Sequence, residues 1–581
     1  MSNSQSVAIT TLSVFGGTVL LSKEIMLALL GKGYFPKELP PTFTTVTFSQ
    51  QIEPILSDWE AAKLYKKQPK KRNQTKYKSN AYGYDIPKAE MESISIPKIG
   101  FEPRTGGITH PIPQALLCEE ITTNYPTIQK WLTRQTYSWD EIRVSQKYAR
   151  AIKGINFPLH RAKKCYIEAT SDWLVKTDIT RFYPSIYTHS LTWAAYGKEK
   201  VKARLKTFEG SLADRLDILV RACNRNQTIG IPVGPETSRI LAEIISSRID
   251  DDLRSSFEDI TIESVDRLQD DWFVGVKTLE RSEKVLSQIG AAYRDYSLDI
   301  NSRKTSVTRI IQHVEEGWKT ELAGFLSHKM GDLRGARLRE FLNLTLRLLL
   351  EYENQAVTNY ALAVLEDQSF VKADVEALES FLLKASVISP GSMSRIAEMI
   401  LNLDYDTKAV SKQRISGRFV ELSTRALENG NTYEAIWLIY TLRGLKCVIA
   451  DKNLIDLIAS SNSSVLALMI LDMKSRGLLR CAISTSYWES QISEISVKTD
   501  WSWLLAYEAM RRGWLPDPNG LMAQPFFAAM HSRGVIFYDE RRNVRKRREM
   551  LRLRKALQKR MRKEVRRFMF TMRDVEFDDY Y

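Results

Sequence analysis

The sequence predicts an α+β fold in which a region containing a sheet precedes a long helical region. Short apolar runs bounded by turn residues occur between residues 170 and 310, as is typical of strands. Beyond about residue 335, apolar side chains recur at helical spacing, for example at Leu338, Leu342 and Leu349. Similar helical lengths then repeat without a clean consensus, so we expect a solenoid-like array. These later segments are residues 375–402, 417–448, 453–477 and 500–513.

Two acidic sites are the most informative feature of the sheet region. Asp178 follows an apolar run at residues 173–175, as a carboxylate at the end of a buried strand would. Asp270 and Asp271 precede a second apolar run, a pattern that predicts a hairpin tip with strands on both sides. If the fold brings these three carboxylates together, they need cations between them, and two divalent ions can clamp the oxygens of a phosphoryl transfer. The sequence therefore predicts a nucleotidyl-transfer enzyme.

Two further segments support this interpretation, since an Asp after a strand is on its own more often a turn or helix-cap residue. A loop at residues 228–238, punctuated by Gly230 and Gly234, precedes an apolar-periodic helix. Glycines there would let the backbone approach a ligand, and a helix N-terminus favours an anion. Residues 296–305 alternate like a strand and include Lys304, which would reach a triphosphate or pyrophosphate or else be a solvated surface lysine.

In this order, the segments resemble the palm motifs of reverse transcriptases. The first motif contains Asp178, the second reads Gly-Ile-Pro-x-Gly from Gly230, and the third contains Asp270 and Asp271. The fourth reads Leu-x-x-Asn-x-x-Lys-Thr and ends at Thr305. The resemblance implies a right-hand polymerase with fingers and palm, followed by the helical region.

Three stretches extend and narrow the resemblance, which covers roughly residues 30–330. Arg104 precedes an Ile-x-His-Pro turn that is similar to the fingers segment of prokaryotic reverse transcriptases. Residues 182–190, Phe-Tyr-Pro-Ser-Ile-Tyr-Thr-His-Ser, resemble the defence-associated branch, the abortive-infection (Abi) polymerases and their unclassified relatives. Residues 33–41 look like the opening motif of that branch.

The resemblance implies a two-metal site. Asp178 and Asp270 would be the principal ligands of two Mg²⁺ ions, with Mn²⁺ as an alternative. Asp271 would be a weaker ligand or a partner of the other two, and the carbonyl of Ile179 would face a metal. Leu268 stands where the third motif usually has Tyr or Phe, so both carboxylates are retained while ordinary primer handling is not expected.

The resemblance also implies a nucleotide site. Tyr183, five positions beyond Asp178, matches the bulky residue that would exclude a ribose 2′-hydroxyl, so dNTPs are the expected substrates. Arg104 would hold the triphosphate through the bidentate geometry of a guanidinium. The remaining residues expected at the nucleotide are Gly230, Gly234 and Lys304.

The implied function is an antiviral, anti-phage DNA polymerase that works without a conventional template and is primed on a protein hydroxyl. RNA-templated cDNA synthesis on an associated noncoding RNA is one alternative, and a non-catalytic nucleic-acid-binding scaffold that senses or sequesters RNA is another. The expected partners are dNTPs together with single-stranded DNA product, RNA or both. Tyr34 is the candidate priming residue because it lies on a glycine-rich segment that we expect to be mobile, and Tyr580 and Tyr581 are alternatives. The family further implies a homo-oligomer, a trimer or a hexamer.

Composition agrees with these expectations without deciding between them. The net charge of +15 and the pI near 9.3 suit a polyanionic partner, although ribosomal and membrane-surface proteins share them. The five cysteines are scattered without a Cys-x-x-Cys pair, which predicts neither a zinc site nor a disulfide framework and favours a reducing cytoplasm. Residues 7–30 are expected to form a packed helix rather than a signal or membrane span.

The chain is expected to divide into four parts. A lead-in with a basic loop would occupy residues 1–79, the fingers and palm residues 80–330, and the helical region residues 335–535. Residues 536–581 would form a basic C-terminal helix and an acidic tail. From Arg541 to Arg567, fifteen of twenty-seven residues are Lys or Arg, interleaved with an apolar stripe. This pattern predicts an amphipathic helix docked on the helical region, whose outer face would contact phosphates.

Overall fold

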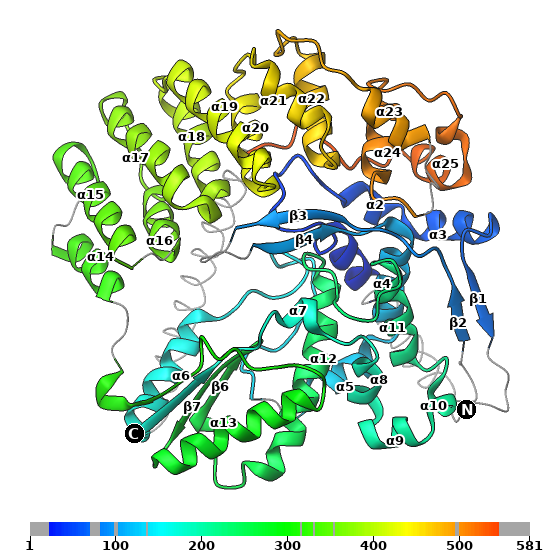
Figure 1. Cartoon of the computed structure of the whole chain (residues 1–581), viewed down its shortest axis with the longest axis vertical. Helices are drawn as coiled ribbons and strands as arrows, with labels where there is room; N and C mark the ends of the chain where they lie inside the picture. The colour runs from blue at the N-terminus through cyan, green and yellow to red at the C-terminus, as the bar shows by residue number, and fades with distance from the viewer. Residues whose placement is uncertain are drawn as a thin grey trace, which may run out of the picture.

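The computed structural model confirms the α+β class, with a small sheet in the lower part of the molecule and an arc of helices above it (Figure 1). It describes residues 22–69, 82–97, 103–134, 137–313, 317–328, 332–352, 355–493 and 499–544. The predicted C-terminal helix, Tyr580 and Tyr581, and most of the basic loop lie outside the described residues. Of the 7–30 segment, only residues 22–30 are described, and they are helical.

The N-terminal part combines short helices with two hairpins. After a helix at residues 22–32, the elements are α2 (Val46–Gln50), α3 (Ile52–Ala61), β1 (Lys66–Pro69), β2 (Tyr82–Asp85), β3 (Glu92–Ile96), β4 (Arg104–Ile108), α4 (Pro111–Thr123) and α5 (Tyr125–Leu132). Strand β1 pairs with β2, and β3 pairs with β4, both antiparallel. The β3–β4 hairpin lies between the arc of helices and the lower sheet (Figure 1). The expected start of the fingers thus lies against the helical region.

The lower sheet has four antiparallel strands in the order β6-β7-β5-β8. Its strands are β5 (Trp173–Thr177), β6 (Val265–Leu268), β7 (Asp271–Val276) and β8 (Ser306–Arg309). Helices α12 (Glu236–Leu253) and α13 (Leu279–Arg294) connect β5 to β6 and β7 to β8. This is a β-α-β-β-α-β order, as in ferredoxin-like folds. The remaining elements here are α6 (Phe157–Thr170), α7 (Phe182–Ser185), α8 (Ser190–Tyr196), α9 (Lys198–Ala203), α10 (Leu205–Phe208), α11 (Leu212–Ala222), η1 (Arg254–Ser256), η2 (Ile262–Ser264) and η3 (Ile310–Gln312).

The two predicted acidic strand ends are confirmed. Strand β5 is an apolar run whose buried members, Leu174 and Val175, face opposite sides of the sheet. Strands β6 and β7 form a hairpin closed by the turn Gln269-Asp270, and Gln269 adopts a left-handed backbone with φ of +59°. Continuous apolar runs form β5 and β7, and polar turn residues close the hairpin.

The prediction of a strand at residues 296–305 is wrong. The carbonyl of Asn301 accepts a hydrogen bond from the Lys304 N–H at 3.0 Å, and its side chain accepts one from the Arg303 N–H at 3.2 Å. These bonds close a turn, as Asn side chains often do. Strand β8 begins only at Ser306, after the turn.

Helices stack on one another throughout the C-terminal half. They are α14 (Gly317–His328), α15 (Gly335–Tyr352), α16 (Gln355–Glu366), η4 (Lys372–Asp374), α17 (Val375–Ile388), η5 (Pro390–Ser392), α18 (Met393–Thr407), α19 (Lys412–Glu428), α20 (Thr432–Gly444), α21 (Lys452–Ala459), α22 (Ser464–Ser475), α23 (Ser486–Ser493), α24 (Trp503–Arg511), η6 (Leu521–Ala523) and α25 (Pro525–His531). From α15 to α22 the helices pack in consecutive pairs, α15 with α16, α17 with α18, α19 with α20 and α21 with α22, and each also contacts the corresponding helix of the neighbouring pair, as in a solenoid. Three of the four predicted segments, 375–402, 417–448 and 453–477, each overlap a pair of helices, and residues 500–513 contain α24.

The far end of the helical arc returns to the start of the chain. Phe43 forms a β-bridge with Tyr538, and Trp59 stacks on Phe526 with ring centroids 5.4 Å apart. The indole N–H of Trp59 also donates to the Phe526 carbonyl at 3.1 Å. The first and last described segments thus share one hydrophobic core.

Two negative expectations can be compared with the described residues. Within them, none of the helices combines the length and hydrophobicity that a membrane span requires. All five cysteines are described, and all are free thiols.

A buried arginine joins the β6–β7 hairpin to α12. The guanidinium of Arg267 is fully buried and donates to Asp250 at 2.7 Å and to Glu243 at 2.6 Å, both on α12. Its Nη1 also donates to the carbonyl of Gln269 at 2.7 Å, inside the hairpin turn. Two carboxylates hold the Arg267 guanidinium in place, and the guanidinium in turn bonds the Gln269 carbonyl. The position of the turn that carries Asp270 is therefore fixed as well.

Replacing this guanidinium is predicted to destabilise the sheet region strongly. Arg267→Met leaves Glu243 and Asp250 buried without a counter-ion, a change that costs about 3–5 kcal/mol in other proteins. We expect a clear fall in the midpoint of thermal unfolding followed by circular dichroism. Arg281→Met is the matched control, because its partner Asp259 is 61% exposed and such pairs contribute about 0–1 kcal/mol. Equal losses in the two variants would contradict the assigned role of Arg267.

Candidate active site

The sheet brings the predicted acidic residues together at one edge. Thr177 pairs with Trp272 across β5 and β7, so Asp178 and Asp271 leave neighbouring strands at the same end. Asp270 lies in the turn beside them, close enough to Asp178 for the two carboxyl groups to interact and raise the pKa of Asp270. Asp178 is 6% exposed, so this charge is largely removed from solvent. The juxtaposition predicted from the motifs is thus present.

The pKa of the Asp270 carboxyl group shows how strongly the acidic residues at this edge interact. Burial, followed by the charges of Asp178 and Asp271, raises its pKa from 3.8 to about 7. A carboxyl group with such a pKa holds a proton at neutral pH for part of the time. The cluster therefore favours any cation that can take the place of that proton.

Lys304 supplies one cation to the cluster. Its ammonium group forms an ion pair with Asp178, while the side chain remains 48% exposed. Although burial alone would lower it, the pKa of Lys304 lies above its ordinary value because Asp178 bonds and attracts the ammonium. The turn is held against β5 by the hydroxyls of Thr177 and Thr305, 2.8 Å apart. Lys304 is therefore an exposed lysine that is paired with the acidic cluster, and its contact with a phosphate stays a prediction.

A cavity of about 430 Å³ opens beside the cluster, on the face of the sheet that α6 covers. Asp178, Asp271 and Lys304 line it together with two cations that the motifs did not indicate, Lys164 and Lys176. Asp266 also lines it, but its carboxylate is engaged by the ring of the buried His160 at 2.8 Å. This cavity contains carboxylates, which attract cations, and lysines, which attract phosphates. It therefore fits a phosphate-bearing ligand accompanied by cations.

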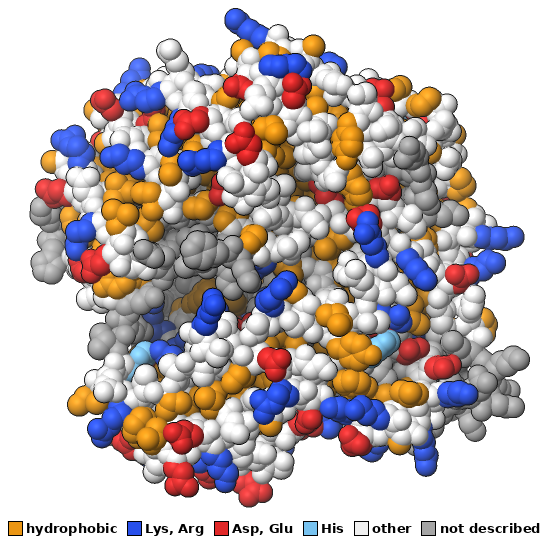
Figure 2. Space-filling view, in the orientation of Figure 1, with side chains coloured by type: hydrophobic (Ala, Val, Ile, Leu, Met, Phe, Trp, Pro, Cys, Tyr) orange, Lys and Arg blue, Asp and Glu red, His pale blue; other side chains and the backbone are white. Residues whose placement is uncertain are grey.

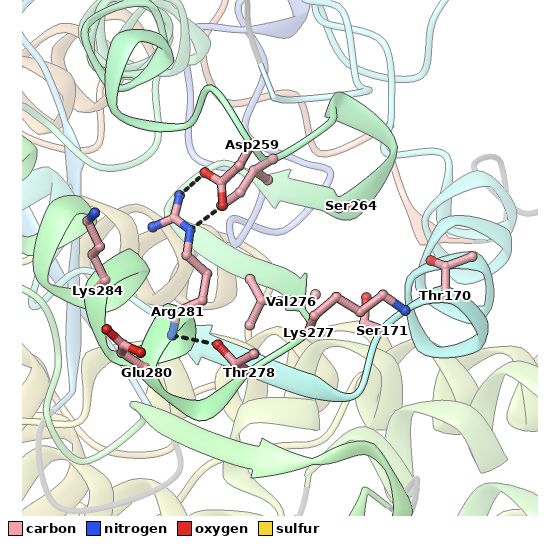
Figure 3. A pocket seen from close by; sticks show the side chains of 12 residues that line it. Thr170, Ser171, Asp259, Ser264, Val276, Lys277, Thr278, Glu280, Arg281 and Lys284 are labelled. Atoms are coloured by element: carbon pink, nitrogen blue, oxygen red, sulfur yellow. Dashed lines mark hydrogen bonds and ion pairs between the residues drawn. The ribbon is translucent and has the colours of Figure 1, made fainter.

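A second cavity of about 500 Å³ lies at the opposite end of β7, around Val276 and the start of α13 (Figure 3). The five-residue separation from Asp271 corresponds to about 16 Å along a strand. Its arginine, Arg281, points toward Asp259 and is held there by two contacts of 2.6 Å (Figure 3). This cavity therefore belongs to a different part of the molecule from the acidic cluster.

Tyr183 lies close to the acidic cluster. Its side chain is half-buried, and burial raises the pKa of the hydroxyl, with Arg239 opposing the shift and Asp270 adding to it. Its carbonyl accepts a hydrogen bond from the Ile231 N–H at 3.0 Å, which ties the first motif to the glycine loop. The contact of Tyr183 with the sugar, and with it the discrimination between dNTPs and rNTPs, stays a prediction.

The two loop glycines are required by contacts within the protein. Gly230 has φ of +88°, and a Cβ there would lie 3.1 Å from the Pro184 carbonyl oxygen. Gly234 has φ of +132°, and a Cβ there would lie 2.7 Å from the Pro36 ring. Left-handed backbone and close approach both favour glycine. The loop is therefore packed on its neighbours, and a nucleotide contact at either glycine is not needed to explain it.

Ile179 and Arg104 have different settings. Ile179 is buried in a β-bridge with Ile300, whose two hydrogen bonds use the residues on either side, so its own carbonyl is not one of the acceptors. Arg104 lies at the exposed start of β4, opposite Ile96. Among the described residues, none of the contacts found for Arg104 joins it to the acidic cluster. Its predicted role toward the triphosphate remains a prediction.

The expectation that Tyr34 lies on a mobile segment is wrong. Tyr34 is fully buried, and its hydroxyl donates to the Thr109 carbonyl at 2.6 Å. Its ring lies 5.0 Å from Phe35 and 6.1 Å from Phe48, and burial raises the pKa of its hydroxyl well above the ordinary value. A buried, bonded phenol cannot attack a nucleotide without leaving the core.

The donor set fits a divalent cation of the Mg²⁺ type. In the described part of the chain, no group of three or more His, Cys, Asp and Glu side chains is arranged to hold a metal ion, and this includes Asp178, Asp270 and Asp271 as a set of three. Mg²⁺ is usually bound by one or two carboxylates together with substrate phosphates, so the pair Asp178 and Asp270 has the expected composition. The raised pKa of Asp270 and the ion pair between Lys304 and Asp178 both show that the negative charge of the cluster attracts protons and cations.

Comparisons with known proteins assign no family. No protein-family model matches the chain, and no curated protein matches it. Among solved structures, telomerase from Candida albicans in complex with the TWJ fragment of telomeric RNA shares 12% identity and a TM-score of 0.25, covering 62% of this chain and 67% of that chain. Telomerase from Candida tropicalis, with that RNA fragment and in the apo form, gives 11% identity and TM-scores of 0.26 and 0.27. These two cover 73% and 74% of this chain, and 68% and 73% of theirs. TM-scores of this size do not establish a shared fold, so the site is interpreted from its own geometry.

The raised pKa of Asp270 predicts a stability that depends on pH. Because the folded state holds the proton more tightly, the charge on Asp270 destabilises the fold progressively as pH rises from about 4 to about 7. In EDTA at pH 8, Asp270→Asn is therefore expected to melt at a higher temperature than the unsubstituted protein. The difference should shrink toward pH 5.

The exposed Asp299, on the neighbouring loop, provides the control: Asp299→Asn should melt as the unsubstituted protein does. Adding Mg²⁺ at pH 8 should stabilise the unsubstituted protein and leave Asp270→Asn nearly unchanged. If Asp270→Asn melts at a lower temperature than the unsubstituted protein in EDTA at pH 8, the assigned environment of Asp270 is wrong.

Proposed function

We propose that the protein is a reverse-transcriptase-like nucleotidyltransferase that polymerises dNTPs. The observation that carries this proposal is the convergence of Asp178 and Asp270 at neighbouring strand ends, beside a lysine and a cavity of nucleotide size. Both carboxylates occur in the order and spacing of polymerase motifs. A purely structural acid pair would not need an adjoining cavity lined by further lysines.

Each residue has a definite part in the proposed reaction. Asp178 and Asp270 would hold divalent cations, which supply charge neutralisation at the α-phosphorus and at the leaving pyrophosphate. Asp271 would add negative charge at the rim of the cavity. Lys304 already contacts Asp178 and would move to an oxygen of the triphosphate when cations neutralise that carboxylate.

The wider proposal is an antiviral DNA polymerase that works without a template and starts on a protein hydroxyl. It draws on the resemblance to Abi polymerases over residues 182–190. The burial of Tyr34 removes the first priming candidate in this conformation and leaves the tail residues Tyr580 and Tyr581. Homo-oligomerisation belongs to the same proposal, and light scattering that shows only monomer at micromolar concentration would oppose it.

RNA-templated synthesis is the alternative within the same chemistry. It differs in one readout: incorporation would then require added or copurified RNA and would stop after ribonuclease treatment. A non-catalytic sensor is the alternative of another class. It would bind nucleic acid and incorporate no nucleotide under any condition.

Removing the acidic pair at the hairpin is predicted to abolish incorporation. Asp270→Asn with Asp271→Asn should reduce Mg²⁺-dependent incorporation of labelled dNTP by at least about a thousandfold, because the charge on the α-phosphorus is no longer balanced. Asp251→Asn with Asp252→Asn is the matched control, since this acid pair lies in the last turn of α12. Label that stays on the denatured protein would support protein priming. Equal incorporation by both double variants would refute the proposed function.

Shortening Tyr183 is predicted to relax sugar selection. Tyr183→Ala opens space beside Asp270 for a 2′-hydroxyl, so the ratio of dNTP to rNTP incorporation should fall by about tenfold or more. The measurement is competitive incorporation from mixed nucleotides. If Tyr183 only fills the core, the variant will lose thermal stability while the ratio stays constant, and the assigned role is wrong.

A further inference from the structure

A surface of aromatic rings and cations adjoins the candidate active site on its far side from the helical arc. It begins at the end of α7 and runs over α8 and α9. We call it the aromatic-basic surface. Its members are Tyr187, His189, Trp193, Ile229 and the cations of residues 198–206.

The rings form a preorganised platform. The Tyr187 ring lies 4.9 Å from that of His189 and 5.5 Å from that of Trp193, both tilted or edge-on. His189 is oriented by Asp217, whose carboxylate lies 2.7 Å from its Nδ1 and also accepts from Arg221 at 3.0 Å. Because Asp217 is almost fully buried, the ring is anchored to the core. Little rotational freedom is left to lose when a flat ligand binds.

Cations surround the platform. Residues 198–206 carry five Lys or Arg side chains against one acid, Glu199. The ammonium groups of Lys198 and Lys202 lie 5.4 Å and 5.5 Å from the centre of the Trp193 ring. Lys198 also bonds Asp295, whereas the other four cations are exposed. Figure 2 shows Lys and Arg side chains beside hydrophobic ones in the region where α8 and α9 lie in Figure 1.

The surface is joined directly to the candidate nucleotide site. Tyr187 forms a β-bridge with Ile229, and the Gly230 N–H donates to the Ile186 carbonyl at 2.8 Å. The next residue of the loop, Ile231, bonds Tyr183. Ile229 itself is 63% exposed, which is unusual for isoleucine and extends the apolar platform toward solvent. Backbone hydrogen bonds therefore connect the aromatic-basic surface to Tyr183, the residue expected at the sugar.

We propose that the aromatic-basic surface binds single-stranded nucleic acid. Bases would stack on Tyr187 and Trp193, while Lys200, Lys202 and Lys206 contact the phosphates. Aromatic rings within a basic groove are the recurring means of binding single strands without sequence preference. A duplex fits poorly, since its bases stack on one another and present no free faces. The identity of the strand rests on the proposed function, because the strand would be the product or the template of polymerisation at the candidate active site.

Binding is measured without catalysis, by fluorescence anisotropy of labelled oligo-dT and oligo-U in EDTA and without nucleotides. The variant K200Q/K202Q/K206Q is expected to weaken binding by about tenfold or more, and to lower the salt slope of the binding constant by about two, since each phosphate contact on a single strand contributes about 0.7. The control K277Q/K284Q/K408Q removes three exposed lysines elsewhere and should bind as the unsubstituted protein does.

The rings are tested separately. Tyr187→Ala and Trp193→Ala are each expected to weaken binding by roughly fivefold or more, the loss typical of one stacked base. Thermal melting shows whether each variant is folded, and the lysine variant keeps the test decisive if a ring variant is not. A loss confined to oligo-dT supports product binding, a loss confined to oligo-U supports RNA binding, and a loss for both supports a general single-strand site.

Two outcomes would overturn the proposal. One is equal binding by the lysine variant and its control. The other is displacement of the oligonucleotide by poly-glutamate as effectively as by unlabelled oligonucleotide at equal charge, which would indicate a general surface for acidic partners. Because the assay needs no incorporation, an inactive protein would refute the proposed function alone, and an active protein with unchanged binding would refute this surface alone.

Discussion

The geometry of the candidate site depends on the buried guanidinium of Arg267. Asp270 lies in a turn whose other residue, Gln269, has a left-handed backbone conformation. Residues other than glycine seldom adopt this conformation without support. Arg267 provides that support by bonding the Gln269 carbonyl while two acids of α12 hold the guanidinium. The stability of the sheet region and the position of the functional carboxylate thus come from the same contact.

The acidic cluster holds three carboxyl groups beside one paired lysine, so its charge is not balanced. Asp178 is paired with Lys304, and Asp270 holds a proton near neutral pH because of burial and of its two acidic neighbours. A divalent cation would replace both, releasing the proton and freeing the lysine for an incoming phosphate. Binding of the cation would therefore depend on pH and on nucleotide, a coupling that a simple surface ion pair does not show.

The elements that depend on local sequence patterns were predicted from the sequence, whereas the features that depend on contacts between distant residues were not. Apolar runs and turn residues were sufficient for β5, the β6–β7 hairpin and the helical region, because those signals lie within a few residues of each other. They were insufficient at residues 296–305, where the side chain of Asn301 closes a turn despite an alternating pattern. Tyr34 is buried through packing against Phe48, which itself contacts Phe537 near the other end of the described chain. No local signal could have indicated that contact, nor the partners of Arg267.

Binding of Mn²⁺ tests the central claim most directly, because it needs neither a template nor a primer. Electron paramagnetic resonance at pH 8 would follow the free Mn²⁺ signal during titration with protein. The account predicts that the unsubstituted protein removes this signal, that Asp299→Asn does so equally, and that Asp178→Asn binds about tenfold more weakly or worse. Equal binding of Mn²⁺ by Asp178→Asn and the unsubstituted protein would contradict the assignment of this edge of the sheet as a metal-dependent active site.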